Sequence, residues 1–478
     1  MAKAVMALLV AWTVWSNIRV QHRQNSRPES QGRYARSIFL PMLPPVMLAF
    51  GFLEYGSLGL MEAVKHIFYE YIPLFVIIAV YNTLLLMAIP ALRRVVDART
   101  CAGIWLIPNV LYLTVVSGRV LLWQEPLWVW TVPGHWVQGA ALVWAGGFVL
   151  VLLGGVFSHL VFQHCLLRDA EPVTDEAVLQ VWRAECRAAG KPDDASPLLI
   201  SPYTQTPLAI GLFRAKLVLP KQQYAPDDLA LVLRHELIHL ERGDIHTKFF
   251  LLFCTALCWW NPLLWLARRR CAEDLELSCD EAALVRAQAP ERKRYAQLIL
   301  TTAGQQRGFT TCLSVSAKAL RYRLRGIIYP GKRRTGAVLA GGLALVVFLS
   351  AGCCTLEWDI GTVEDHFLEG HAEDWTLQTV RVEGETLPDQ NGGCWDTDDL
   401  MQTLAGLTLI RRAGSDVLPR EKTPGKLELV LRSGETVLCL EFWPGQVAGG
   451  RLWPLGKERV YHLDDPAALE GLLRFLPE

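Results

Sequence analysis

Apolar and polar stretches alternate along this chain at a length that predicts membrane-spanning helices. The hydrocarbon core of a bilayer is about 30 Å thick and needs about 20 apolar residues in a helix. Residues 72–92 (IPLFVIIAVYNTLLLMAIPAL) reach this length and are followed by Arg93-Arg94. The pattern predicts spans at 4–18, 37–54, 72–92, 102–122, 137–162 and 336–352, of which 4–18 is short for a crossing. The first five form an N-terminal membrane region, residues 1–163.

Lys and Arg in the short loops predict the orientation of these spans, because such residues accumulate on the cytoplasmic side. Three segments are basic and are predicted to face the cytoplasm: 19–36, 93–99 and 332–334. Two loops carry Glu and few basic residues, and are predicted to lie outside: 54–71 and 123–136. The sequence therefore predicts a multi-pass protein of the cell membrane, with residues 164–335 in the cytoplasm and residues 353–478 outside.

Composition supports a membrane location and argues against a nucleic-acid partner. Hydrophobic residues make up 51% of the chain, and the 17 Trp are many for a soluble protein. The formal net charge is zero, so no overall positive field attracts nucleic acid. The 12 Cys show no repeated CxxC. Four of them lie close together and are interpreted as small buried side chains rather than zinc ligands: Cys254, Cys258, Cys271 and Cys279.

Residues 231–246 (LVLRHELIHLERGDIH) contain the pattern that carries chemistry. His235 and His239 are four apart, so on a helix both imidazoles lie on one face and can bind one metal ion. Glu236 can act as the general base on a zinc-bound water, as in HExxH peptidases. The alternative is a chance pair in a core helix, but such a pattern arises by chance on the order of 0.01 times in a chain with this many histidines.

A catalytic zinc site needs a third protein ligand and an open position. Glu276 and Asp280 are again four apart on a helical pattern, so Glu276 can complete a His₂Glu site. Asp280 can then accept the remaining ring N–H of a ligand histidine. The alternative is a solvated acidic face, an interpretation that suits Glu273 and Asp274.

The stretch between these two helices constrains the model. Residues 249–267 (FFLLFCTALCWWNPLLWLA) are apolar enough for a span. A single crossing would separate Glu276 from the histidines and prevent a metal site. The stretch must therefore re-enter the membrane, lie along its surface or form core helices of the peptidase domain, and Asn261-Pro262 suits a bend.

The chain resembles the integral-membrane zinc metallopeptidases of the BlaR/MecR type in five segments. These are HELIHLERGD, WWNPLLW, ELSCDEA, TPLAIGLFRAKLVLP (206–220) and LRYRLRGII. The resemblance covers roughly residues 164–335. It implies a mainly α, zincin-type (gluzincin-like) cytoplasmic metallopeptidase domain. It further implies that His235, His239 and Glu276 bind Zn²⁺, that Glu236 is the catalytic base and that Asp280 orients a ligand. The roles of Arg242, Asp244 and His246 stay unassigned.

The C-terminal segment departs from the family's β-lactam sensors. Ser415 and Ser433 do not begin S-x-x-K, so acylation by a β-lactam is not expected. Residues 353–478 instead predict a small α+β domain with strands at 376–383 and 427–443, a turn at Ser433-Gly434 and a helix at 466–475. Whether Cys394 and Cys439 form a disulfide stays open.

These observations favour a membrane-embedded zinc endopeptidase that transmits an outside signal. Its expected partners are an extracellular ligand and a cytoplasmic protein substrate, such as a transcriptional repressor or the chain itself. The alternatives are a quality-control peptidase for membrane proteins and a receptor or scaffold with structural zinc. The presence of Glu236 argues against the scaffold, since structural zinc needs no base. The sequence leaves homo-oligomerisation open.

Overall fold

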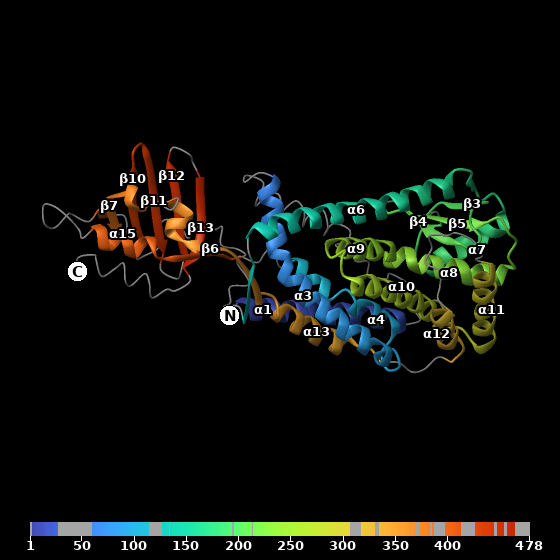
Figure 1. Ribbon diagram of the computed structural model, residues 1–478. Helices are drawn as coiled ribbons and strands as arrows, with labels where there is room; N and C mark the ends of the chain where they lie inside the picture. Colours follow the sequence, from blue (N-terminus) through green and yellow to red (C-terminus); the bar gives the residue numbers. More distant parts are fainter. Residues whose placement is uncertain are drawn as a thin grey trace. The chain divides into compact units, whose positions relative to one another are not determined.

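The computed structural model describes residues 2–26, 60–113, 127–305, 317–368, 372–382, 385–386, 397–412 and 426–463. Within these ranges, residues 133, 194–195, 213, 330–333, 444–446 and 454–456 are left out. The predicted span at 37–54, the helix at 466–475 and Cys394 lie outside this part. The chain divides into two compact units (Figure 1). The helical unit comprises residues 1–57, 74–117 and 144–351, and the sheet unit comprises residues 58–73, 118–143 and 352–478.

Two described helices are long and apolar enough, by length and composition alone, to cross a membrane. They are α3 (Leu60–Leu92) and α6 (Gly134–Leu167), and they contain the predicted spans 72–92 and 137–162. Two shorter apolar helices, α1 (Ala2–Ser26) and α13 (Ala337–Leu349), pack against each other. Gly341 allows this approach, because a Cβ there would lie 3.1 Å from the Ala11 carbonyl oxygen.

Residues 102–122, predicted as a span, do not form one continuous helix in the described part, which stops at 113. Helix α4 (Ala98–Ile104) starts at the Asp97 cap and is followed by a 3₁₀ helix, η2 (Pro108–Leu113). Pro108 lacks an amide donor and disfavours a helical residue before it. Seven residues of helix cover about 10 Å, which is too short to cross a bilayer.

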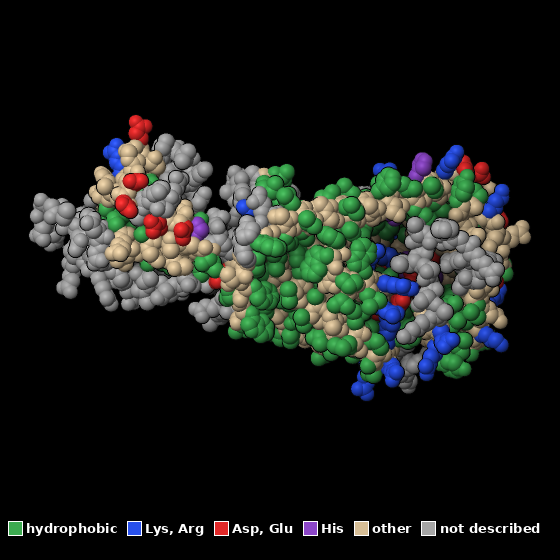
Figure 2. Space-filling view, viewed as in Figure 1, with side chains coloured by type: hydrophobic (Ala, Val, Ile, Leu, Met, Phe, Trp, Pro, Cys, Tyr) green, Lys and Arg blue, Asp and Glu red, His purple; other side chains and the backbone are tan. Residues whose placement is uncertain are grey.

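The surface of the helical unit changes character along its length. Large apolar side chains on α6 are exposed, among them Leu150, Leu153 and Phe157. Figure 2 shows this green apolar surface giving way to blue Lys and Arg side chains toward one end of the unit. An extensive exposed apolar face suits contact with lipid, and a basic band suits the boundary of such a face.

The loops predicted to be cytoplasmic lie beside each other. Val96 and Arg334 form a parallel β-bridge. The Arg334 amide donates to the Val95 carbonyl at 2.8 Å, and the Asp97 amide donates to the Arg334 carbonyl at 3.1 Å. These contacts agree with a common side for 93–99 and 332–334, although which side of a membrane that is remains a prediction.

A small mixed sheet and two helices form the first layer of the predicted peptidase domain. The sheet has the order β2-β3-β5-β4, with β2 (Glu171–Pro172), β3 (Leu198–Ser201), β4 (Leu208–Ile210) and β5 (Lys216–Pro220). Helices α7 (Glu176–Ala188) and α8 (Pro226–Arg242) share its core. Leu229, Leu233 and Leu237 recur every four residues on α8 and belong to this core, which leaves the histidine face of α8 for other helices.

The apolar stretch at 249–267 forms a bend between two helices, as predicted. Helix α9 (Asp244–Leu257) ends before Asn261, whose side chain caps the first turn of α10 (Pro262–Ala283). The bend packs on the apolar helices: Trp144 of α6 donates to the Leu257 carbonyl at 2.7 Å, and Phe75 of α3 contacts Trp260 edge to face. Because α10 packs back against α9 and α8 (Figure 1), a single crossing is excluded. Helices α11 (Ala289–Gln305) and α12 (Ala317–Ile328) follow.

The sheet unit contains a nine-stranded sheet of order β1-β6-β9-β13-β12-β11-β10-β7-β8. Its strands are β1 (Trp128–Val132), β6 (Cys354–Thr362), β7 (Thr376–Val382), β8 (Glu385–Thr386), β9 (Thr408–Arg412), β10 (Leu427–Ser433), β11 (Thr436–Trp443), β12 (Val447–Trp453) and β13 (Lys457–Leu463). It also contains α14 (Val363–Phe367), α15 (Thr397–Ala405) and a 3₁₀ helix, η3 (Ala372–Asp374). The predicted strands at 376–383 and 427–443 are confirmed as β7 and as the pair β10 and β11. Gly434, with a φ of 58°, turns the chain between β10 and β11.

Strand β1 was not predicted, because it comes from the loop at 123–136. It pairs in parallel with β6, from Trp128 opposite Cys354 to Val132 opposite Trp358. Pairing of this kind requires the loop and the C-terminal segment to lie on the same side of a membrane. The predicted topology, which puts both outside, meets this requirement.

Asp274 is fully buried, so its interpretation as part of a solvated acidic face is wrong. Arg93, just beyond α3, places its Nε 2.7 Å from Asp274 Oδ1. The Trp105 indole donates to Asp274 Oδ2 at 2.8 Å, and the Arg93 guanidinium lies over the ring of Tyr322. A buried carboxylate needs such partners, and their positions far away in the sequence hid them.

Replacing Asp274 with Asn should lower the free energy of unfolding by about 3–5 kcal/mol, because Arg93 would keep a buried charge without its carboxylate. Thermal unfolding of the purified protein in detergent measures this. The double variant Arg93→Met/Asp274→Leu should recover most of the loss. Arg183→Gln, which breaks the exposed 2.8 Å pair with Glu176, is the control and should cost less than about 1 kcal/mol. Equal melting of Asp274→Asn and wild type would contradict the argument.

Candidate metal centre

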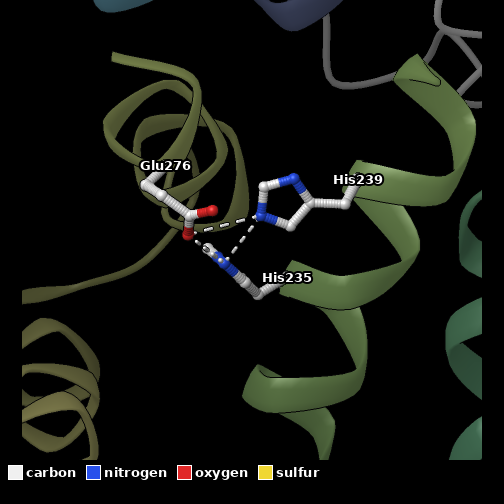
Figure 3. A group of neighbouring side chains, drawn as sticks. All are labelled: His235, His239 and Glu276. Carbon is white, nitrogen blue, oxygen red and sulfur yellow. Dashed lines mark hydrogen bonds and ion pairs between the residues drawn. The ribbon is translucent and has the colours of Figure 1, made fainter. Parts of the chain in front are cut away.

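His235, His239 and Glu276 point toward one another in the gap between α8 and α10 (Figure 3). The two Nε2 atoms are 3.1 Å apart, and Glu276 Oε2 lies 3.6 Å from His235 Nε2 and 3.5 Å from His239 Nε2. Bonds of about 2.0–2.2 Å to a tetrahedral Zn²⁺ would separate such ligand atoms by about 3.3–3.5 Å. The donor set and its spacing therefore fit zinc, with a fourth position left over.

Helices α8 and α10 approach closely because small side chains lie between them. Ile238, Cys279 and Ala283 form one buried cluster at this contact. Arg242, whose role the motif left open, is buried and donates to the Ser278 hydroxyl at 2.7 Å and to the Ser278 carbonyl at 3.0 Å. These contacts fix Glu276, two residues before Ser278, against the histidine face of α8.

Asp244 holds the His239 ring in place, a role that the sequence did not assign. A hydrogen bond of 2.8 Å joins His239 Nδ1 to Asp244 Oδ2. A carboxylate only accepts, so Nδ1 carries the hydrogen and Nε2 is left for a metal. Gly243, with a φ of 67°, ends α8 and turns the chain so that Asp244 faces back toward His239. Arg99 of α4 in turn lies 3.4 Å from Asp244.

The His235 ring is held through Tyr295. The Tyr295 hydroxyl lies 2.8 Å from both His235 Nδ1 and Asp280 Oδ1. Asp280, predicted to orient a ligand, lies 3.4 Å from His235 Nδ1, so the shorter connection runs through Tyr295. Arg323 of α12 clamps the same carboxylate with two hydrogen bonds of 2.7 and 2.8 Å. Tyr295 and Arg323 carry no metal-site pattern in the sequence, and only the fold brings them here.

Glu236 lies on α8 beside the three ligand candidates but is not one of the group. Its Oε2 accepts a hydrogen bond of 3.0 Å from the amide of Ala209 on β4. Burial raises the pKa of Glu236, and the nearby histidines oppose this. A carboxylate whose pKa is raised toward neutrality is suited to take up and return a proton.

The other site groups form a charged cluster. Burial opposes the ionised form of Glu276, yet His239 and Lys248, with hydrogen bonds from both histidines, hold its pKa well below the usual value. Burial likewise opposes a charged His239, but Cys279, Glu276 and Asp244 raise its pKa well above the usual value. A metal ion at this site would take the place of the proton on His239.

The site opens into a cavity of about 1790 Å³ that lies within the helical unit. Its wall includes Glu236, the ligand candidates and β4 on one side, and parts of α3, α6, α9, α10 and α12 on the others. A second group of donors, Glu428, Cys439 and Glu441, lies in the sheet unit. Lys426 is already 2.7 Å from Glu441 there, so a cation neutralises that group.

Comparison with known proteins agrees with this geometry. Residues 114–327 match the family model described as BlaR1 peptidase M56. This match supports a peptidase domain of the BlaR/MecR type in the chain. Over 183 residues it is 26% identical to "Regulatory protein BlaR1" of Bacillus licheniformis, a match that covers 38% of this chain and 30% of that protein. The match supports a peptidase activity for this domain.

In this BlaR/MecR-type domain, Asp244→Asn should weaken zinc binding about 10- to 100-fold while leaving all three ligand candidates in place. The carboxylate that fixes the His239 ring would become a neutral amide. Competition with a chromophoric chelator measures the affinity. Asp227→Asn, an exposed acid on the first turn of α8, is the control and should bind zinc like wild type. An Asp244→Asn variant with unchanged affinity would show that Asp244 does not position His239.

Zinc binding should release about one proton near neutral pH, because the raised pKa of His239 favours its protonated form in the metal-free protein. Its raised pKa means that affinity rises with pH until the pH exceeds that pKa. Titration calorimetry in two buffers of different ionisation enthalpy gives the number of protons released. Binding heats that do not depend on the buffer would contradict a protonated His239.

Proposed function

We propose that this chain is a membrane-embedded zinc endopeptidase that transmits an extracellular signal by cleaving a cytoplasmic protein. The observation that carries the proposal is the triangle of His235, His239 and Glu276, with Glu236 beside it on the cavity wall. A site for structural zinc alone would fill its fourth position with a protein side chain and would need no adjacent general base.

When bound, Zn²⁺ supplies Lewis acidity toward a scissile carbonyl and a water. The protein supplies the remaining parts. Glu236 takes the proton of the attacking water and returns it to the leaving amine. Tyr295 and Asp244 hold the two imidazoles with their Nε2 atoms directed to the metal position. Each of these groups is in place before a substrate arrives.

Strand β4 suits the main chain of an extended substrate. It lies at the edge of its sheet and, among the strands that the structure describes, pairs only with β5. The Ala209 amide points from that edge toward Glu236. A peptide that adds to this free edge would pass beside the metal position, which is a common way for a protein to bind an extended chain.

A continuous set of contacts within the helical unit supports signal transmission. The base of α13 is joined to residues 95–97 through Arg334, and these residues lead directly into α4. Helix α4 contacts the metal centre in two places: Arg99 lies 3.4 Å from Asp244, and the Ala98 amide donates to Glu281 of α10 at 3.1 Å. Since α13 is continuous in sequence with the C-terminal segment, a shift of α13 would reach both Asp244 and α10.

The proposed partners follow from the predicted topology. The substrate is a cytoplasmic protein, such as a transcriptional repressor, or the chain itself. The signal is an extracellular ligand of the C-terminal segment. These assignments rest on the sequence prediction that residues 164–335 are cytoplasmic and residues 353–478 extracytoplasmic.

Glu236→Gln should retain zinc and reduce cleavage by at least about 100-fold, because the ligands remain and the base is gone. The measurement is quantitative proteomics of cytoplasmic protein termini in cells that carry wild type or the variant. New termini that appear with wild type and are absent with Glu236→Gln identify the substrate. His235→Ala should lose both zinc and cleavage. Wild-type protein that binds zinc, with a terminus profile identical to that of Glu236→Gln under inducing and resting conditions, would favour the non-catalytic scaffold.

A further inference from the structure

Arg268 occupies an unusual position on the cavity wall. It lies on α10, eight residues before Glu276, and is half-buried. Its guanidinium lies 5.2 Å from the centroid of the Trp265 ring. Within the described residues it forms no ion pair, although a guanidinium taken out of water is favourable only with partners.

Neighbouring arginines on the same wall differ in this respect. Arg270 lies 2.8 Å and Arg269 3.9 Å from carboxylate oxygens of Glu273, and Arg93 is paired with Asp274. Burial opposes the charged form of Arg93, yet Asp274 raises its pKa, whereas burial lowers the pKa of Arg268 with no carboxylate to offset it. The charge of Arg268 is therefore the one on α10 that the described protein leaves uncompensated inside the cavity.

The rest of the wall adds positive charge. Arg94, Arg321 and Arg325 also line the cavity and form no ion pair with any described residue. A cavity with surplus positive charge attracts an anionic ligand.

We propose that Arg268 binds a carboxylate of the substrate, so that this cavity selects peptides with Asp or Glu three or four residues from the scissile bond. The inference rests on the proposed function for the metal centre. Eight residues of α-helix separate Arg268 from Glu276 by about 12 Å. An extended peptide covers about 3.3 Å per residue, so three or four residues bridge that distance. Guanidinium and carboxylate form paired, charge-assisted hydrogen bonds, which gives the contact geometric selectivity.

A phospholipid headgroup is the competing anion, because basic residues near a membrane boundary attract acidic lipids. The position of Arg268 favours the peptide. Arg268 shares a cavity with Glu236 and the ligand candidates. An arginine that only binds lipid headgroups at the membrane boundary would need only an outer surface.

The binding test uses the full-length, zinc-loaded protein with Glu236→Gln to prevent cleavage, in nanodiscs of phosphatidylcholine. Two fluorescent nonapeptide libraries of mixed composition serve as probes, one with a fixed central Glu and one with Gln. Fluorescence anisotropy should show the Glu library binding at least about tenfold more tightly. Adding Arg268→Gln should remove this preference, and Arg268→Lys should keep part of it. Arg269→Gln, which alters the adjacent and already paired arginine, is the matched control and should keep the preference in full.

Equal binding of the two libraries, or a preference that survives Arg268→Gln, would overturn the proposal. So would loss of copurified phosphatidylglycerol on Arg268→Gln without any peptide preference, since that result assigns the arginine to lipid. Zinc content and melting temperature confirm that each variant is folded, and Arg268→Lys carries the test if Arg268→Gln does not fold. Because this assay needs no turnover, it can succeed even if the chain cuts nothing.

Sequencing the products of a peptide library cleaved by wild type then tests the spacing. Acidic residues should be enriched three or four positions from the cut, and the enrichment should vanish in Arg268→Gln. Cleavage with no acidic preference would refute the selectivity while leaving the proposed peptidase function intact.

Discussion

The contact of Glu276 with His235 and His239 is the interaction on which the helical unit depends. It requires α10 to return to α8 after an apolar excursion, and Asn261-Pro262 makes that return possible. It also requires the two Nε2 atoms to lie 3.1 Å apart, and each ring is held in that position by a contact at its other nitrogen. Gly243 turns Asp244 to one ring, and α11 brings Tyr295 to the other.

The supporting contacts come from opposite parts of the unit. His239 is held by Asp244, which leads to Arg99 on α4 and so to the loop beside the base of α13. His235 is held by Tyr295 and Asp280, which lead to Arg323 on α12. One ring is therefore supported mainly from α4 and the other from α11 and α12, and α10 contacts both sets of supports. A rearrangement of α4 would reach His239 through Asp244 and would also reach α10 through Glu281.

How much the sequence predicted depended on how far apart the partners lie. The spacing of His235 and His239 is a property of one helix, so it was predictable, as was the hairpin of β10 and β11 with its two-residue turn. Glu276 followed from the motif and the resemblance, and the structure places it beside both histidines. The burial of Asp274 was missed because its partner, Arg93, follows α3 and is far away in the sequence. Composition alone also misjudged residues 102–122, since an apolar run says nothing about where a helix breaks.

Strand β1 shows the same limit in the sheet unit, because only the fold could join a loop near residue 128 to a strand near residue 354. The partners of the buried polar groups in the helical unit also lie far apart in the sequence, so the sequence did not reveal them. These groups matter more than β1 because they position the metal centre. The ligand atoms are 3.1–3.6 Å apart, so a displacement of α10 by about an ångström would take Glu276 out of reach of the metal position.

Helix α10 is tied to the end of α3 through Asp274 and Arg93, and to α4 through Glu281. Both ties leave the peptidase domain for the membrane region, so the geometry of the metal centre depends on the packing of apolar helices. Zinc affinity and the arrangement of those helices are then linked by thermodynamics: whatever shifts the helices changes the affinity, and zinc in turn favours one arrangement of them. In the proposed function, the position of α10 would therefore control the metal centre.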